Sequence, residues 1–172
     1  GTFHSICAKI LRRHSKAVNL NQNFTIIDQD DQLRLIKSIC NAENIDIKKI
    51  SPNFIISLIN KWKNFGWYPD GVILNKSESL ERNLLKIYKI YQTKLTNLNA
   101  CDFGDLILHC VSIFEQNPDI NDMYSKNFKY ILVDEYQDTN FIQSKWLKLL
   151  TKNHENICCV GDDDQSIYSW RG

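Results

Sequence analysis

Two groups of acidic residues each follow a short apolar run in the last third of the chain. Asp134 and Glu135 come directly after the run at 130–133, and a run of aspartates begins at Asp162, shortly after the apolar run at 157–160. Mg²⁺ is usually held in proteins by one or two carboxylates together with phosphate oxygens of a substrate. Residue type and spacing therefore indicate a magnesium and phosphate site with Asp134 and Glu135 as metal ligands. The alternative is an ordinary polar ending of a surface strand.

A β-α-β unit is expected to position these acidic groups. The runs at 130–133 and 157–160 are short, rich in apolar residues and not alternating, which predicts strands buried on both faces of a parallel sheet. The segment 140–152 has apolar residues at helical spacing. In open parallel sheets, ligands bind at the carboxyl ends of the strands. We therefore predict an α/β fold with both acidic groups at one edge of the sheet.

Three motifs in a fixed order resemble those of one enzyme family. The string DEYQD at 134–138 resembles the DExQD form of the Walker B motif of superfamily-1 DNA helicases of the UvrD/Rep/PcrA type. GDDDQSIYSWRG at 161–172 resembles the motif that follows it in that family, and TFHS at 2–5 matches a third motif. Because the matches keep the family order and bracket the chain, we identify the resemblance as covering its whole length.

The resemblance implies roles for the acidic site. Asp134 is expected to hold the Mg²⁺ of Mg-ATP, and Glu135 is expected to act as general base on the attacking water within the same metal and nucleotide site. Gln165 resembles the family residue that contacts the γ-phosphate and takes part in catalysis. The implied cofactors are ATP and Mg²⁺.

The resemblance also implies residues that bind DNA. Thr2 and His4 are expected to contact the backbone of single-stranded DNA at the start of a helix, which favours phosphate. Tyr168 and Trp170 are expected to stack on bases, with Arg171 beside them. The alternatives are a packing role for His4 and core packing for the two aromatic residues, which would share one face of a strand.

Capping residues followed by apolar residues at helical spacing predict most of the chain before residue 125 to be helical. The expected helices begin near Thr2, Asp28, Ser51, Ser77 and Asp102, and 24–27 is expected to be extended. The end of the helix that begins at Ser51 resembles the family's inserted helical subdomain. By this resemblance, Lys61, Lys63 and Asn64 are expected to approach duplex DNA. The segment 102–106 resembles the family's DFxDL string, with Gly104 in place of an acidic residue.

The expected organisation has two parts. Residues 1–125 are assigned to a mostly helical part that includes a 1B-like inserted subdomain, and residues 126–172 to part of a RecA-like P-loop NTPase domain of 1A type. The spacing GxxxxG at 66–71 lacks the Lys-Ser/Thr pair of a Walker A loop. We therefore expect a fragment, with a Walker A loop before it and a second motor domain after it. By itself the fragment is expected not to hydrolyse ATP, because phosphoryl transfer depends mostly on positioning.

Charge is unevenly distributed along a chain whose net charge is +1. Residues 1–100 hold 15 Lys and Arg against 8 Asp and Glu, whereas residues 101–172 hold 6 against 12. A basic part suits a polyanionic partner and an acidic part suits a metal, although solvated helix faces would give the same asymmetry. No apolar run is long enough to span a membrane, and the start does not resemble a signal peptide, so a cytoplasmic protein is expected.

The six cysteines include no CxxC pair, which favours reduced and buried thiols over disulfides or structural zinc. Cys158 and Cys159 lie within an apolar run and are expected to be buried there.

The most concrete functional interpretation is an ATP-dependent DNA helicase that moves along single-stranded DNA and unwinds duplexes at single-strand/double-strand junctions. The family resemblance suggests 3′ to 5′ polarity and a setting in DNA repair or replication. Two alternatives stay open: the helicase-nuclease subunit of a recombination complex, and a DNA-binding module without catalysis.

Overall fold

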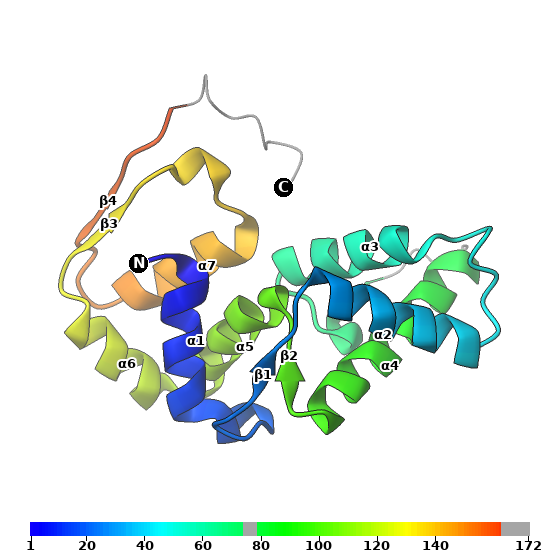
Figure 1. Cartoon of the computed structure of the whole chain (residues 1–172). Coiled ribbons are helices and arrows are strands. Elements are labelled where there is room, and N and C mark those ends of the chain that lie inside the picture. Colours follow the sequence, from blue (N-terminus) through cyan, green and yellow to red (C-terminus); the bar gives the residue numbers. More distant parts are fainter. Residues whose placement is uncertain (74–78, 163–172) are drawn as a thin grey trace.

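The structure is a computed structural model and describes residues 1–73 and 79–162 (Figure 1). The helices are α1 (Phe3–His14), α2 (Gln29–Ala42), α3 (Pro52–Asn64), α4 (Ser79–Asn97), α5 (Phe103–Gln116), α6 (Pro118–Asn127) and α7 (Phe141–Thr151). The strands are β1 (Thr25–Ile26), β2 (Ala100–Cys101), β3 (Ile131–Val133) and β4 (Ile157–Cys159). Short 3-10 turns lie at Ser15–Val18, Pro69–Gly71 and Tyr136–Asp138. The chain is mostly helical with two small parallel sheets, β1–β2 and β3–β4.

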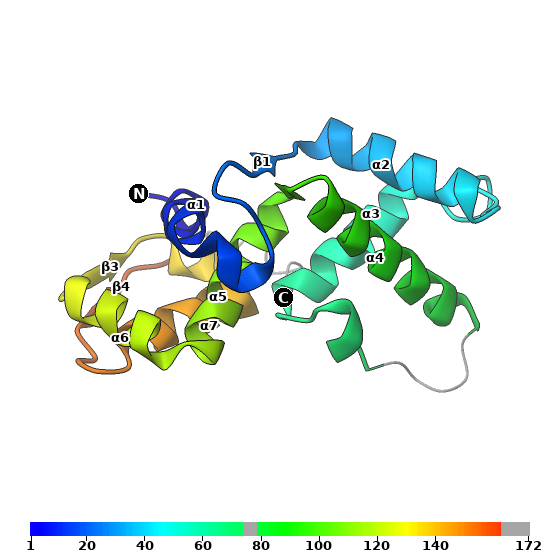
Figure 2. The same cartoon turned by 90° about the horizontal axis from the view of Figure 1, so that it is seen from below.

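Buried apolar side chains gather in two clusters. The first core is formed by α1, α5, α6, α7 and β3, and the second core is formed by α2, α3 and α4. Figures 1 and 2 show the two groups of elements side by side, with β1 and β2 where they meet. The cores do not divide at the predicted boundary between residues 125 and 126, because α1 and α5 pack with β3. The RecA-like and inserted-subdomain assignments stay predictions.

Helix α5 is the centre of the first core. It packs against α1, α6, α7 and also α3 of the second core. Trp146 of α7 directs its indole N–H at the Cys110 sulfur, 3.2 Å away, and Phe114 packs against Tyr124 of α6 with ring centroids 5.6 Å apart. Because α5 is apolar on most of its surface, several elements can cover it at once. This is what holds α1 and α7 in fixed positions around it.

Capping residues start four of the five helices at the predicted places, and the fifth predicted start, Ser77, lies outside the described residues. The side chains of Thr2, Asp28, Ser51 and Asp102 each accept the backbone N–H of the residue three positions later. Asp102 also forms a capping box in which the Asp105 side chain accepts the Asp102 N–H at 3.2 Å. Helix α6, which begins at a proline, and the pairing of β1 with β2 were not predicted.

The predicted β-α-β unit is present, but the prediction that both of its strands are buried on both faces is wrong. β3 and β4 are parallel, with Ile131 opposite Ile157 and Val133 opposite Cys159, and α7 lies between them in sequence. Val133 is buried in the first core, but Leu132 is 74% exposed and β4 is exposed along its length. The helices thus cover one face of this sheet in the described part of the chain. Leu132 is directed away from them because side chains alternate along a strand.

The cysteines are free thiols. Cys7, Cys40, Cys101 and Cys110 are buried, as expected, whereas Cys158 and Cys159 lie on the exposed strand β4, which corrects the prediction for that pair. Among the described residues, no helix combines the length and apolar character needed to cross a membrane.

Candidate functional site

A cavity of about 560 Å³ lies between the start of α1 and the carboxyl end of β3. Its lining includes Thr2 and His4 from one side and Asp134, Glu135 and Asp138 from the other. Two motifs more than 125 positions apart in the sequence are thus brought to one site. The floor is apolar, because Val133, Trp146 and Leu150 of the first core also line the cavity.

The acidic turn after β3 directs two adjacent carboxylates at solvent. Glu135 has a left-handed backbone conformation, with φ 53° and ψ 43°, and its N–H donates to Asp134 Oδ1 at 3.0 Å. Both residues are exposed, and neither has an ion-pair partner among the described residues. Adjacent carboxylates that are not paired with a cation offer the oxygen ligands that a hard divalent cation prefers, so this donor set fits Mg²⁺.

The segment after β4 lies against the acidic turn. The Val160 N–H donates to the Val133 carbonyl at 2.8 Å, and the Tyr136 N–H donates to the Val160 carbonyl at 2.9 Å. The Asp162 N–H donates to Gln137 Oε1 at 3.0 Å. The described start of the second acidic group therefore meets the first one at the same sheet edge, as the β-α-β unit predicts. The other predicted residues of this motif, Gln165, Tyr168, Trp170 and Arg171, lie outside the described residues.

The start of α1 forms the other wall of the cavity. Thr2 Oγ1 accepts the Ser5 N–H at 3.2 Å, and the Ser5 hydroxyl donates to the Thr2 carbonyl at 2.9 Å. His4 is half-buried, and burial lowers its pKa, so the imidazole is neutral at neutral pH. The His4 ring meets the Phe103 ring edge-on, with centroids 5.8 Å apart. The wall therefore offers helix N-terminal N–H groups and a neutral ring rather than a cation.

Phe103 is a candidate site residue that the sequence reasoning missed. It is 51% exposed although it is a large aromatic residue, and it lies beside His4 at the start of α5. The available signal was its place directly after the cap Asp102. By helical spacing Phe103 shares a face with Leu106 and Cys110, which lie in the first core, so periodicity alone predicts burial, and its exposure comes with its position at the very start of the helix.

The prediction that Lys63 contacts DNA is wrong in this structure. Its side chain is fully buried, and its Nζ lies 2.7 Å from Asp102 Oδ2 and 2.7 Å from Asp105 Oδ1. Burial by itself would lower the pKa of Lys63, but the two carboxylates outweigh burial and raise it. A Cβ on Gly104 would lie 2.9 Å from Lys63 Cδ, which explains why the smallest residue occupies this position. Lys63 is a structural cation.

Lys61 and Asn64 occupy different environments near the end of α3. Lys61 is exposed and keeps its predicted accessibility to a polyanion. Asn64 is half-buried, and its Oδ1 accepts a hydrogen bond from Asn140 Nδ2 at 3.0 Å. Asn140 is the cap of α7, two residues after the acidic turn. The structure thus attaches Asn64 to the segment that follows the candidate site.

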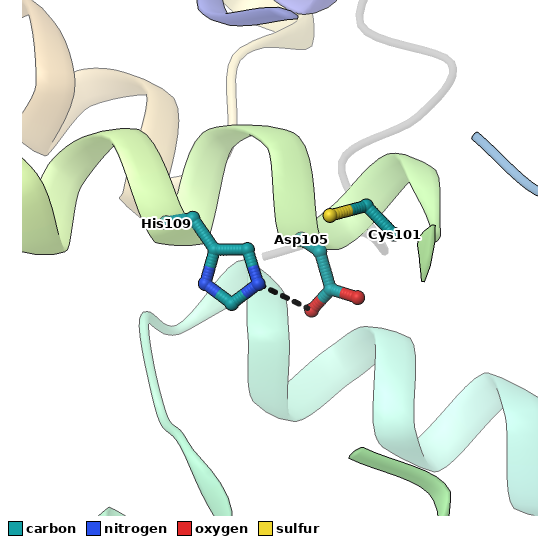
Figure 3. A group of neighbouring side chains, drawn as sticks. All are labelled: Cys101, Asp105 and His109. Atoms are coloured by element: carbon teal, nitrogen blue, oxygen red, sulfur yellow. Dashed lines mark ion pairs between the residues drawn. The ribbon is translucent and has the colours of Figure 1, made fainter. Parts of the chain in front are cut away.

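Three buried side chains of metal-binding type meet at the start of α5. Figure 3 shows Cys101, Asp105 and His109, whose possible ligand atoms lie within 4.8 Å of one another. Asp105 already has the Lys63 ammonium at 2.7 Å, and His109 Nδ1 is hydrogen-bonded to the Tyr68 hydroxyl at 2.6 Å. Burial lowers the pKa of His109 and raises that of Cys101, which disfavours a thiolate. We therefore assign this cluster to a paired polar network rather than to a metal.

Comparisons with known proteins match the chain along its whole length. The family model for the UvrD/REP helicase N-terminal domain matches residues 1–172. A "DNA helicase II" of Rickettsia typhi is 47% identical over 100% of this chain and 27% of its own length, and a "Probable DNA helicase II homolog" of Rickettsia felis is 46% identical over the same shares. An "ATP-dependent DNA helicase PcrA" of Staphylococcus aureus strain COL is 43% identical over 99% of this chain and 23% of its own length. The chain spans about a quarter of these relatives.

Proposed function

The chain belongs to the UvrD/REP helicase N-terminal domain family, and we propose that the protein containing it couples ATP hydrolysis to movement along single-stranded DNA and to unwinding of duplexes. The relatives that match it are DNA helicases. The observation that supports the proposal most is the single cavity between the TFHS segment and the acidic turn. A nucleotide bound at the turn would lie within reach of the helix that we assign to DNA.

On the nucleotide side, we assign binding of Mg-ATP to Asp134 and general-base action to Glu135. The metal would neutralise charge that develops on the transferred phosphoryl group. Asp134 suits this role because it directly follows the buried end of β3, and no cationic side chain among the described residues forms an ion pair with its carboxylate. Glu135 is exposed toward the cavity, so its carboxylate can accept a proton from an attacking water. Gln165 keeps its proposed contact with the γ-phosphate on motif resemblance.

On the DNA side, we assign backbone contacts to Thr2 and His4 and base stacking to Phe103. The start of α1 presents free N–H groups, which favour a phosphate. Phe103 presents an exposed ring beside them, and stacking on a ring needs no particular base. Lys61 adds an exposed cation on the second core. Tyr168, Trp170 and Arg171 complete the proposed DNA site on motif resemblance.

Polarity and biological setting follow from motif resemblance alone. We propose 3′ to 5′ movement, action at single-strand/double-strand junctions, and a role in DNA repair or replication.

The test is Glu135→Gln in the full-length protein. We expect loss of 10²- to 10⁴-fold in the kcat of DNA-stimulated ATP hydrolysis, the size of a general-base contribution, because the amide cannot accept the proton of water. Affinity for single-stranded DNA should be retained, since Glu135 is assigned no DNA contact. Glu155→Gln is the matched control, because Glu155 is also exposed but lies after α7. Unchanged hydrolysis in Glu135→Gln would contradict the motor and favour a non-catalytic DNA-binding module.

A further inference from the structure

The side-chain amide of Gln137 makes two hydrogen bonds in opposite directions. Its Nε2 donates to Glu135 Oε2, and its Oε1 accepts the backbone N–H of Asp162 at 3.0 Å. An amide has donors on one end and an acceptor on the other, so these two bonds fix which way it points. One half-buried side chain thus joins the acidic turn after β3 to the segment after β4.

The close approach of Gly161 to Gln137 confirms that the two segments fit together tightly. A Cβ at position 161 would lie 2.7 Å from Gln137 Oε1 and 3.2 Å from the Gln137 backbone nitrogen. Contacts below 3.0 Å force a shift, so any larger residue at 161 would displace the amide oxygen of Gln137. The backbone hydrogen bond from the Tyr136 N–H to the Val160 carbonyl, at 2.9 Å, also joins the acidic turn to the segment after β4.

We propose that Gln137 is a positioning residue that orients the Glu135 carboxylate and links this orientation to the position of the segment 161–162. The proposal rests on the function assigned to Glu135 above. A hydrogen bond to an ionised carboxylate is among the stronger ones and holds Oε2 in place. The other carboxylate oxygen, Glu135 Oε1, then remains to accept a proton from the attacking water. A displacement of residues 161–162 moves Gln137 Oε1, which accepts the Asp162 N–H. Because the amide is rigid, Gln137 Nε2, which donates to Glu135, moves with it.

The first test replaces Gln137 by Ala and by Glu in the full-length protein. We expect each change to lower kcat for ATP hydrolysis about 10- to 100-fold, the effect of one hydrogen bond to a charged group, with KM for ATP changed less than about threefold. Gln137→Glu keeps the length and the acceptor for Asp162 but has no donor for Glu135 at neutral pH. Gln116→Ala is the matched control, because Gln116 is exposed at the end of α5.

The second test is a double-mutant cycle with Gly161→Ala. In the wild-type background the added methyl displaces Gln137 Oε1, so we expect a loss of kcat of about tenfold or more. In the Gln137→Ala background the same methyl has room on that side, so the further loss should be under about threefold. Strict multiplication of the two losses would show that Gly161 and Gln137 act independently, which overturns the link.

The outcomes separate this inference from the proposed function. If Glu135→Gln keeps its hydrolysis, the proposed function fails and the inference fails with it. If Glu135→Gln is inactive while Gln137→Glu keeps kcat within about twofold of wild type, only the positioning role is overturned. A rise in KM that accounts for the whole loss also overturns it, because that pattern indicates nucleotide binding. If Gln137→Ala is unfolded at the assay temperature, the result with Gln137→Glu decides.

Discussion

The buried Lys63 network allows a sharp prediction about stability. Lys63→Met removes the ammonium and keeps an unbranched apolar stem of similar length. Asp102 and Asp105 then stay buried without the cation that lies 2.7 Å from each. Removing one partner of a buried ion pair costs about 3–5 kcal/mol, because the remaining charge is left uncompensated. A typical domain has about 5–15 kcal/mol in total, so this is a large effect.

The remaining hydrogen bonds place the expected loss at the lower end of that range. Asp102 Oδ2 still accepts the Tyr91 hydroxyl at 2.9 Å and Gln32 Nε2 at 3.2 Å. Asp105 Oδ1 still accepts Gln92 Nε2 at 2.7 Å. Each carboxylate therefore keeps part of its stabilisation, and we expect a loss of about 3 kcal/mol in the free energy of unfolding.

Urea unfolding followed by tryptophan fluorescence measures this loss, since Trp62 lies in the second core next to Lys63. Lys61→Met is the matched control: Lys61 is exposed on the same helix, so its change should stay within about 0.5 kcal/mol. Lys63→Met combined with Asp105→Asn should recover at least about 1 kcal/mol, because one uncompensated carboxylate is neutralised. A loss below about 1 kcal/mol for Lys63→Met, or no recovery in the double variant, would refute the reasoning.

The dependence on pH gives an independent check. Burial by itself would raise the pKa of Asp105, but the Lys63 ammonium outweighs burial and lowers it. A carboxyl whose pKa is lowered on folding contributes stability above its unfolded pKa of about 3.9, and this is lost as pH falls through the folded pKa. In Lys63→Met the ammonium no longer opposes burial, although the hydrogen bonds from Gln92 and from the Asp102 N–H remain. The pKa of Asp105 therefore rises, and acidification costs the variant less stability than it costs the wild type. The deficit of the variant should therefore shrink as pH falls from neutral toward about 5, and a constant deficit would contradict this account.

Two further predictions concern DNA binding and the activity of the chain by itself. Phe103→Ala should weaken binding of single-stranded DNA by about 5- to 150-fold, the contribution of one base stacked on an aromatic ring. Phe54 is 52% exposed on α3, and Phe54→Ala should leave binding unchanged. Fluorescence anisotropy measures both, and equal effects of the two changes would rule out the stacking role. The isolated 172-residue chain, which contains no GxxxxGK[ST] loop, should show no DNA-stimulated release of phosphate. Turnover above background would contradict the expectation that this chain by itself cannot position the phosphates for hydrolysis.

Local signals in the sequence predicted the elements that position the site. Helix starts at Thr2, Ser51 and Asp102 could be predicted because the cap side chain and the backbone N–H that donates to it are only three residues apart. The unit from β3 through α7 to β4 could be predicted because, within one stretch of chain, a continuous apolar run is followed by apolar residues at helical spacing and then by a second continuous run. The meeting of the DEYQD turn with Asp162 follows from the rule that parallel strands end at one edge.

The environments of single residues depend on partners distant in sequence. Lys63 and Asp102 are 39 positions apart. Lys63 follows Ile59 by four positions and so shares the buried face of α3, whereas the exposed Lys61 does not, but this spacing gives no sign of the carboxylates that pair with Lys63. The apolar run at 157–160 predicted burial, but Cys158 and Cys159 are both exposed. Because side chains alternate along a strand, Cys158 shares the open face of the sheet with Leu132, whereas Cys159 lies on the other face and is exposed there as well. Burial of a strand depends on what packs against it, and apolar composition alone does not specify that.

The end of α3 contacts both the second core and the segment after the acidic turn. Lys63 joins it to the start of α5, and the next residue, Asn64, joins it to Asn140, the cap of α7. Ile142 of α7 also packs 3.4 Å from the position of a Cβ on Gly66, just beyond α3. Since the cap of α7 lies two residues after the DEYQD turn, a shift of α3 cannot occur without breaking these contacts or moving the start of α7. Lys63 and Asn64, which the family resemblance assigned to DNA, thus connect the helices α2–α4 to the proposed nucleotide site.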